Sequence, residues 1–186
     1  MRGIKKSILL VAVLFVGLLM FTGCDKKKEE ETKKSDLKNP KTITVEGKKG
    51  KVEVTYDDDG NYEYAAGEEV TLKNTKSNFN FTFSFGTNTI ARQEKLKERN
   101  AKADGYEVLD VKYNGYSGYV VINETLSITQ VVLYVDKANE VVFIAKAKPV
   151  NTTKAKNAIK NGTDPKDVIY NLKNVQQILS SIEYIK

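Results

Sequence analysis

The segment FNFTFSF, residues 79–85, places phenylalanine at every second position and a polar residue at each position between. Side chains of a β-strand point alternately to the two faces of a sheet, so this pattern predicts a strand with one buried aromatic face and one polar face. Such two-faced strands are typical of antiparallel sheets. The segment therefore predicts an antiparallel sheet with an aromatic core.

The sequence on both sides continues this alternation. A hairpin is predicted over residues 106–122, because Asn114-Gly115 suits a two-residue turn whose central residues both need positive φ. Tyr113 and Tyr116 flank this turn and are expected to pair across the strands. The other expected strands are residues 41–47, 50–56, 68–74, 127–136 and 140–148.

Three helices are expected between and after the strands. Residues 87–103 predict a helix capped by Thr87 or Asn88, with a thin apolar face that suits the surface of a sheet. Residues 153–160 predict a short helix. A final helix is expected to begin at Asp164 and to pack on the core through one apolar stripe. The stripe consists of Val168, Leu172, Val175, Leu179 and Ile182.

This order of elements predicts the fold class. Strands in a block, one helix, four more strands and a closing helix indicate an α+β fold. We expect an antiparallel β-sheet packed by a C-terminal helix and a central surface helix.

The first residues have the pattern of a secretory signal. Arg2, Lys5 and Lys6 precede an apolar run over residues 8–21, and Thr22 and Gly23 follow it. The apolar run is shorter than the roughly 20 residues that a membrane-spanning helix needs. A retained membrane anchor is the alternative interpretation.

The end of this signal, Phe21-Thr22-Gly23-Cys24, resembles the lipobox of bacterial lipoproteins. The resemblance implies cleavage between Gly23 and Cys24 and acylation of the Cys24 thiol, with chains such as palmitate. Phe21 departs from the leucine that the family usually has at that position. Two or three acyl chains would hold the protein at the extracytoplasmic face of the cell membrane, because a single chain binds only marginally.

The remaining chain divides into a tether and a domain. Residues 24–41, which begin with the lipidated cysteine, are charged and lack aromatic residues, so we expect a flexible tether. Residues 42–186 are expected to form a single α+β domain. Without residues 1–23 the formal charge is 27 − 24, or +3, which gives little support to a nucleic-acid partner.

The order of elements in residues 42–186 is similar to the PsbP-like fold, an antiparallel sheet between helices. That resemblance implies a binding or assembly-factor role rather than catalysis. Abundant lysine and asparagine indicate an AT-rich genome, which favours a Gram-positive source.

The composition excludes several kinds of catalytic site. The chain has no histidine, so it can form neither a Ser-His-Asp triad nor a histidine metal site. Its only cysteine is assigned to lipid, and no cofactor is expected. The alternative function is a carboxylate- or cation-dependent hydrolase at the cell surface, which Glu68 and Glu69 or the aspartates would serve.

The segment Asp57-Asp58-Asp59-Gly60-Asn61 is a weak candidate cation site, because calcium prefers clustered carboxylates. It does not fit an EF-hand, since Thr55 and Ala66 stand where the loop needs acidic ligands. A solvated turn is the simpler interpretation.

Tyr113, Tyr116 and Tyr119 are weak candidate binding residues, because tyrosine suits interfaces. Ordinary strand composition is the simpler interpretation, because tyrosine has a high β propensity. The leading functional hypothesis is a membrane-anchored extracytoplasmic lipoprotein. Its non-catalytic domain would bind an envelope protein or a small ligand.

Overall fold

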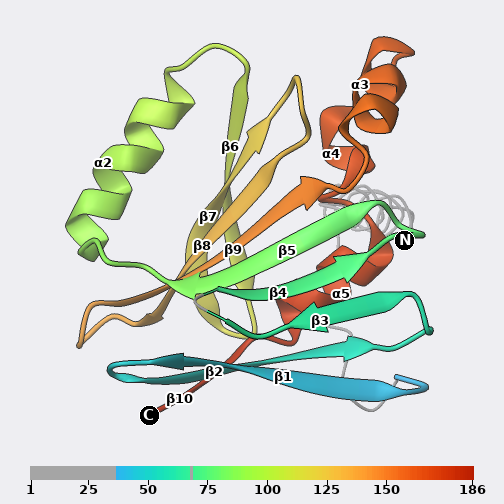
Figure 1. Ribbon diagram of the computed structural model, residues 1–186. Helices are drawn as coiled ribbons and strands as arrows, with labels where there is room; N and C mark the ends of the chain where they lie inside the picture. The colour runs from blue at the N-terminus through green and yellow to red at the C-terminus, as the bar shows by residue number, and fades with distance from the viewer. Residues whose placement is uncertain (1–36, 68) are drawn as a thin grey trace, which may run out of the picture. The chain divides into compact units, whose positions relative to one another are not determined.

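A computed structural model describes residues 37–67 and 69–186 of the protein (Figure 1). These residues belong to one compact unit. The expected signal over residues 1–23 and most of the expected tether lie outside the described residues. The first described strand begins at Pro40, two residues before the expected boundary of the domain.

The strands form two antiparallel sheets. The larger sheet has seven strands in the spatial order β3 (Tyr62–Ala65), β4 (Val70–Asn74), β5 (Phe79–Phe85), β9 (Val141–Pro149), β8 (Thr129–Asp136), β7 (Tyr116–Asn123) and β6 (Tyr106–Tyr113). The smaller sheet has the order β1 (Pro40–Gly47), β2 (Gly50–Asp57) and β10 (Glu183–Ile185).

Four helices complete the described part of the chain. They are α2 (Ile90–Ala101), α3 (Thr152–Lys160), α4 (Pro165–Val168) and α5 (Lys173–Ser180). The helix α2 connects β5 to β6, and the other three follow β9 in sequence (Figure 1). The expected α+β class, with antiparallel sheet and helices, is confirmed.

The main core lies between the inner face of the large sheet, the small sheet and α5. Phe79, Phe81 and Phe83 of β5 are buried there, and the rings of Phe81 and Phe83 stack with centroids 5.1 Å apart. Val52 and Val54 of β2 face them from the small sheet. The alternation in FNFTFSF therefore sets the inner face of β5, and strand pairing carries that face to the neighbouring strands β4 and β9.

The outer face of the large sheet is only partly covered. The helix α2 lies over β6 and β7, where Ile90 packs against a small cluster that includes Tyr119, Val132 and Tyr134. Figure 1 shows no described helix in front of β3, β4 and β5 on this side. This confirms the expected surface position of the central helix.

The turn of the predicted hairpin is also confirmed. Asn114 and Gly115 have φ values of 46° and 84°, as the two central residues of this tight turn require. Tyr113 and Tyr116 are directly paired across β6 and β7.

The expected single C-terminal helix is wrong, because the chain forms two short helices with a break at residues 169–172. In an unbroken helix each residue advances about 100° around the axis, so Ile169 would point away from the core-facing stripe. The break allows Ile169 to be fully buried. It also frees the carbonyl of Tyr170 to accept a hydrogen bond from Gln176 Nε2 at 2.6 Å.

Three other expectations need correction. The short strands β3 and β10 were not predicted, because each has few residues and gains its hydrogen bonds only from a neighbouring strand. The N-cap of α2 is Thr89, whose Oγ1 accepts from the Arg92 backbone N–H, rather than Thr87 or Asn88. A second sheet covers part of the inner face, which is too wide for the eight residues of α5 alone.

Replacing Phe81 with alanine should lower the free energy of unfolding by about 3–5 kcal/mol, because a buried ring is removed and a cavity is left. Chemical denaturation measures this change. Thr82→Ala is the matched control, since the adjacent side chain points to the outer face and should cost about 1 kcal/mol or less. Equal losses for both variants would contradict the assigned inner face.

Candidate functional site

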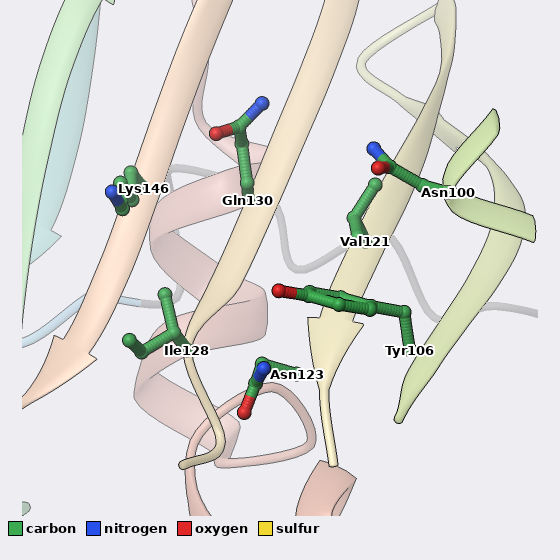
Figure 2. Close-up of a pocket in the computed structure, with 7 residues that line it drawn as sticks. All are labelled: Asn100, Tyr106, Val121, Asn123, Ile128, Gln130 and Lys146. Atoms are coloured by element: carbon green, nitrogen blue, oxygen red, sulfur yellow. The ribbon is translucent and has the colours of Figure 1, made fainter. Parts of the chain in front are cut away.

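A pocket of about 260 Å³ lies on the outer face of the large sheet, beneath the C-terminal end of α2 (Figure 2). We call it the α2 pocket. It combines an aromatic ring, two aliphatic side chains, three amides and one ammonium group. Its lining residues are Asn100, Tyr106, Val121, Asn123, Ile128, Gln130 and Lys146.

The pairing of three strands positions the floor of the α2 pocket. Val121 of β7 is paired with Gln130 of β8, which is paired with Lys146 of β9, so the three residues form one row on the outer face. Tyr106 and Asn123 form the next pair, at the edge of the sheet. Asn100 comes from the last turn of α2. The polar groups of the floor are thus held by strands rather than by loops, which favours a preformed site.

The amide of Asn123 has a defined orientation. Its Oδ1 accepts hydrogen bonds from the backbone N–H groups of Thr125 at 3.1 Å and Leu126 at 2.8 Å. Figure 2 shows this oxygen turned away from the ring of Tyr106. The remaining Nδ2 group is a donor only. Asn123 therefore presents the two N–H hydrogens of its Nδ2 group at the rim of the pocket.

Lys146 and Tyr106 can also donate hydrogen bonds to a ligand, and the amides of Asn100 and Gln130 can donate or accept. Lys146 is the only charged residue among the seven that line it, and an ammonium group donates without accepting. The hydroxyl of Tyr106 points across the pocket towards Gln130 and Ile128 (Figure 2). The ring of Tyr106 is 42% exposed, an unusual exposure for a large side chain in this domain. It offers a flat apolar surface beside the donors.

Polar contacts hold α2, the roof of the pocket, on the sheet. The Tyr119 hydroxyl donates to Gln93 Oε1 at 2.9 Å, and the Tyr134 hydroxyl donates to Glu94 Oε1 at 2.5 Å. Lys97 forms an ion pair with Asp110 of β6. Because Gln93 is the only residue of α2 that is fully buried, these contacts rather than a broad apolar stripe fix the helix.

Burial keeps the two hydroxyls under α2 protonated. It raises the pKa of Tyr119 to about 12, with a smaller contribution from the nearby Glu94 carboxylate. Burial also raises the pKa of Tyr134, and the hydrogen bond to Glu94 adds to the effect. Both phenols therefore act as donors at neutral pH and attach α2 to the sheet.

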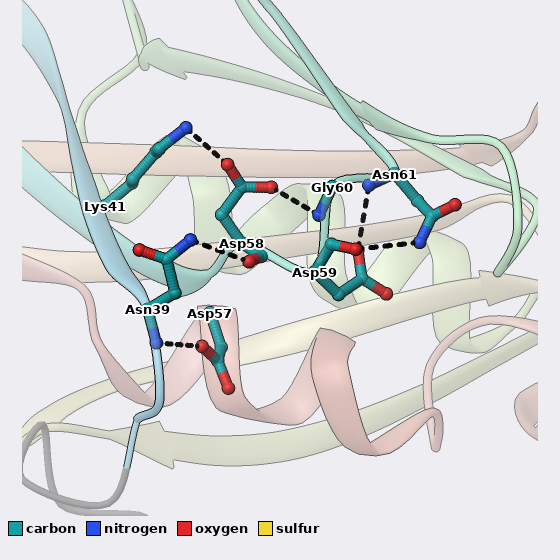
Figure 3. Close-up of polar contacts among 7 residues, drawn as sticks. All are labelled: Asn39, Lys41, Asp57, Asp58, Asp59, Gly60 and Asn61. Atoms are coloured by element: carbon teal, nitrogen blue, oxygen red, sulfur yellow. Dashed lines mark hydrogen bonds and ion pairs between the residues drawn. The ribbon is translucent and has the colours of Figure 1, made fainter.

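The acidic segment 57–59 forms a turn whose carboxylates point in different directions (Figure 3). Asp57 Oδ1 accepts from the Asn39 backbone N–H at 2.7 Å, and Asp59 Oδ1 accepts from the Asn61 backbone N–H at 3.1 Å. Asp58 pairs with Lys41 and accepts from the Gly60 N–H, and these contacts lower its pKa.

These contacts leave little basis for the weak cation site considered at Asp57, Asp58 and Asp59. Within residues 37–67 and 69–186, no group of three or more acidic, histidine or cysteine side chains could hold a metal ion. The segment has the contacts of a turn stabilised by its own side chains.

The candidate binding tyrosines occupy structural positions. Tyr113 is buried on the inner face, and its hydroxyl donates to Tyr170 Oη at 2.9 Å. The hydroxyl of Tyr116 accepts from the Tyr184 backbone N–H at 3.0 Å. Tyr119 lies on the outer face beneath α2. Tyr113 and Tyr116 lie on the inner face and contact the C-terminal segment, whereas Tyr119 lies on the outer face and contacts α2, so the three side chains do not form one binding surface.

The residues of the α2 pocket were not singled out from the sequence. One signal was available, because Gln130 and Lys146 interrupt strands that are otherwise largely apolar. Their pairing with Val121 and their position beneath Asn100 depend on strand order and on the path of α2. Neither can be read from periodicity.

Two larger hollows lie elsewhere in the described domain. One of about 520 Å³ lies beside the turn between β1 and β2 and includes Glu140, and one of about 590 Å³ includes Asp58. Neither of these hollows gathers two carboxylates, and the α2 pocket contains none. These three hollows therefore lend no support to the hydrolase alternative, which needs a carboxylate pair. Glu68 lies outside the described residues.

Gly23 and Cys24 also lie outside the described residues, so the structure does not bear on cleavage or lipidation. In the described part of the chain, no helix has the length and apolar character needed to cross a bilayer. Comparison with protein-family models, curated proteins and solved structures found no match for this chain.

The burial of the Tyr119 hydroxyl beneath α2 predicts a pH dependence of stability. The folded pKa of Tyr119, about 12, lies above its ordinary value of 10.0. A raised pKa stabilises the folded state fully below pH 10, and this stabilisation is lost as the pH rises towards 12. Tyr119→Phe should therefore lose stability less steeply than the wild type above pH 10.

Denaturation profiles at a series of pH values between about 8 and about 11.5 measure this difference, because the range runs from below the ordinary pKa of 10.0 to just below the folded pKa of about 12. Tyr64→Phe, which alters a tyrosine that is 48% exposed, controls for the loss of a phenol. Parallel profiles for the wild type and Tyr119→Phe would contradict the assigned role.

Proposed function

We propose that this chain is a lipid-anchored protein of the extracytoplasmic membrane face, and that its domain binds a small ligand in the α2 pocket. The ligand is rich in hydrogen-bond acceptors and neutral or anionic. The domain binds rather than catalyses, and the proposal involves no cofactor. The observation that carries the proposal is the convergence of donors around the exposed ring of Tyr106.

The N-terminal sequence supports the anchor. A basic start, an apolar run and the Gly23-Cys24 junction are the parts of a lipoprotein signal. From Cys24 to Asn39, which contacts Asp57 of the domain, the chain can span at most about 50 Å when fully extended. Membrane lipid is thus the proposed partner of acylated Cys24.

The size and chemistry of the α2 pocket support a small ligand. Its volume of about 260 Å³ lies just below the range of roughly 300–1,000 Å³ for drug-sized molecules. Lys146 and the Nδ2 group of Asn123 favour carboxylate, phosphate or hydroxyl oxygens. Tyr106 adds a surface for an apolar or ring-shaped part. A small acidic or hydroxyl-rich molecule satisfies all three residues together.

An envelope protein is the other class of partner expected from the sequence. The resemblance of residues 42–186 to the PsbP-like fold, which rests on element order, supports a binding or assembly-factor role in the same way. In this proposal the domain contains the ligand site, and the N-terminal signal determines the location of the protein.

Replacing Cys24 with alanine should abolish incorporation of a labelled fatty acid, because the thiol is the proposed site of acylation. Metabolic labelling followed by mass spectrometry measures this. Lys26→Ala, two residues away, is the matched control and should label like the wild type. Equal labelling of the Cys24→Ala protein, or a native protein that still starts at Met1, would contradict the anchor.

Replacing Tyr106 with alanine should weaken binding of small probes by about tenfold or more, because a stacking surface and a donor are lost. Glucose, glucuronate, glutamate and inorganic phosphate are suitable probes for ligand-observed NMR. Tyr64→Ala removes a similarly exposed tyrosine outside the pocket and should leave binding unchanged. Lys146→Gln should weaken only the anionic probes. Probe binding that Tyr106→Ala leaves unchanged, or that Tyr64→Ala weakens equally, would contradict the site.

A further inference from the structure

A long segment of the domain carries positive charge alone. Residues 141–163, which contain β9 and α3, include five lysines and no acidic residue. All five side chains are exposed, and none has an ion-pair partner within the described residues 37–67 and 69–186. We call this surface the β9–α3 basic patch; it consists of Lys146, Lys148, Lys154, Lys156 and Lys160.

The nearest acidic residues in sequence do not neutralise the patch. Asp164 caps α4 by accepting from the Lys166 N–H at 2.9 Å, and its other oxygen lies 3.6 Å from Lys166 Nζ. Asp167 accepts from Asn171 Nδ2 at 2.6 Å. Glu140 lies at the opposite end of β9, beside the turn between β1 and β2. The patch therefore keeps a strong local excess of positive charge.

The patch lies at the rim of the domain where the anchored end of the chain arrives. Asn39, just before β1, contacts Asp57 at the end of β2. Across the core, Asn174 Nδ2 contacts both Tyr62, at the start of β3, and Ser77, in the turn between β4 and β5.

That turn contacts the start of α3. The backbone N–H of Asn151, the N-cap of α3, donates to Asn78 Oδ1 at 2.6 Å. The start of β1, the β4–β5 turn and α3 thus share one rim, while the β1–β2 and β8–β9 turns lie at the other end (Figure 1).

The same rim also carries negative charge, but at a separate place. Asp57, Asp58 and Asp59 lie on the turn between β2 and β3, on the side of the small sheet, and Asp58 is paired with Lys41. Asp104 and Glu124 lie at the rim beyond the α2 pocket. This negative charge therefore lies apart from the lysines of β9 and α3.

We propose that the β9–α3 basic patch docks the domain on anionic phospholipid of the membrane to which Cys24 is tethered. Clustered lysines are attracted to an anionic leaflet within about one Debye length, roughly 8 Å at physiological salt. The tether supplies the proximity, since it keeps this rim within about 50 Å of the lipid and raises its effective concentration there. The inference rests on the proposed anchor.

This docking has a consequence for the ligand site. Lys146 belongs both to the patch and to the α2 pocket. A docked domain therefore holds the pocket close to the leaflet and leaves the β1–β2 and β8–β9 turns facing away from it.

Energy transfer to labelled lipid headgroups tests the orientation in the full-length, lipidated protein. The chain has a single cysteine, and acylation blocks its thiol, so one introduced cysteine can be labelled alone. Asn157→Cys places the dye on exposed α3, and Ala138→Cys places it on the opposite turn. The protein is reconstituted in vesicles of phosphatidylcholine with or without phosphatidylglycerol.

Transfer from position 157 should rise about twofold or more when phosphatidylglycerol is present, and transfer from position 138 should not rise. Raising the salt from about 0.1 M to about 1 M should remove the difference, because the Debye length falls from about 10 Å to about 3 Å. Equal transfer from both positions, or a difference that ignores lipid charge, would overturn the proposal.

A charge variant tests the lysines themselves. Changing Lys148, Lys154, Lys156 and Lys160 together to glutamine should abolish the rise at position 157 and leaves Lys146 in the pocket. The matched control changes four exposed lysines elsewhere, Lys48, Lys95, Lys112 and Lys137, and should keep the rise. Loss of the rise in both variants would show a response to total charge alone and would contradict a docking patch.

The outcomes separate docking from the anchor and from another partner. If Cys24 is not acylated, mass spectrometry shows a free thiol and the protein does not remain with the vesicles, which overturns the anchor and the docking on it. If the protein is anchored but position 157 shows no lipid-dependent rise, only the docking is wrong. If soluble heparin binds through these lysines while anionic vesicles do not change position 157, the patch recognises a free polyanion and the membrane proposal is wrong.

Discussion

Burial of the aromatic row of β5 is the constraint on which the rest of the structure depends. The buried rings are those of Phe79, Phe81 and Phe83. They lie on the face of the large sheet that the small sheet and α5 cover. Strand pairing transmits that choice, because a residue paired with a buried residue shares its face. The outer face of β9 and β8 thereby receives Lys146 and Gln130, so the position of the aromatic core decides where polar groups of the candidate site stand.

The outer face is held by a different balance of forces. Only Ile90 of α2 packs on the apolar cluster there, and the helix depends on hydrogen bonds from Tyr119 and Tyr134 and on the ion pair between Lys97 and Asp110. These contacts come from the first two turns of the helix. Its last turn, with Asn100, roofs the pocket instead of filling the space above β7 and β8. A helix with a thin apolar face thus leaves room for a ligand where a strongly amphipathic helix would close the sheet.

Charged side chains are paired in some parts of the domain and unpaired in others. The turn at residues 57–59 uses its carboxylates on nearby backbone groups and on Lys41, whereas the lysines of β9 and α3 have no such partners among the described residues. Local compensation removes a charge from long-range interactions, and uncompensated charge steers association. The proposed anchor, the proposed docking surface and the α2 pocket therefore belong to one picture, in which a tethered domain presents a small-ligand site close to a lipid surface.

Periodicity and turn chemistry by themselves determined the α+β class, most strand positions, the hairpin at Asn114-Gly115 and the surface position of the central helix. These features depend on neighbouring residues, and local sequence encodes them directly. Only the tertiary structure decided the strand order, the second sheet with β10, the break before α5 and the seven residues that form the pocket. Each of these depends on which distant segment covers a given face. Three tyrosines illustrate the difference. The sequence does not tell whether Tyr113, Tyr116 and Tyr119 are exposed, whereas in the folded domain each hydroxyl makes a structural hydrogen bond.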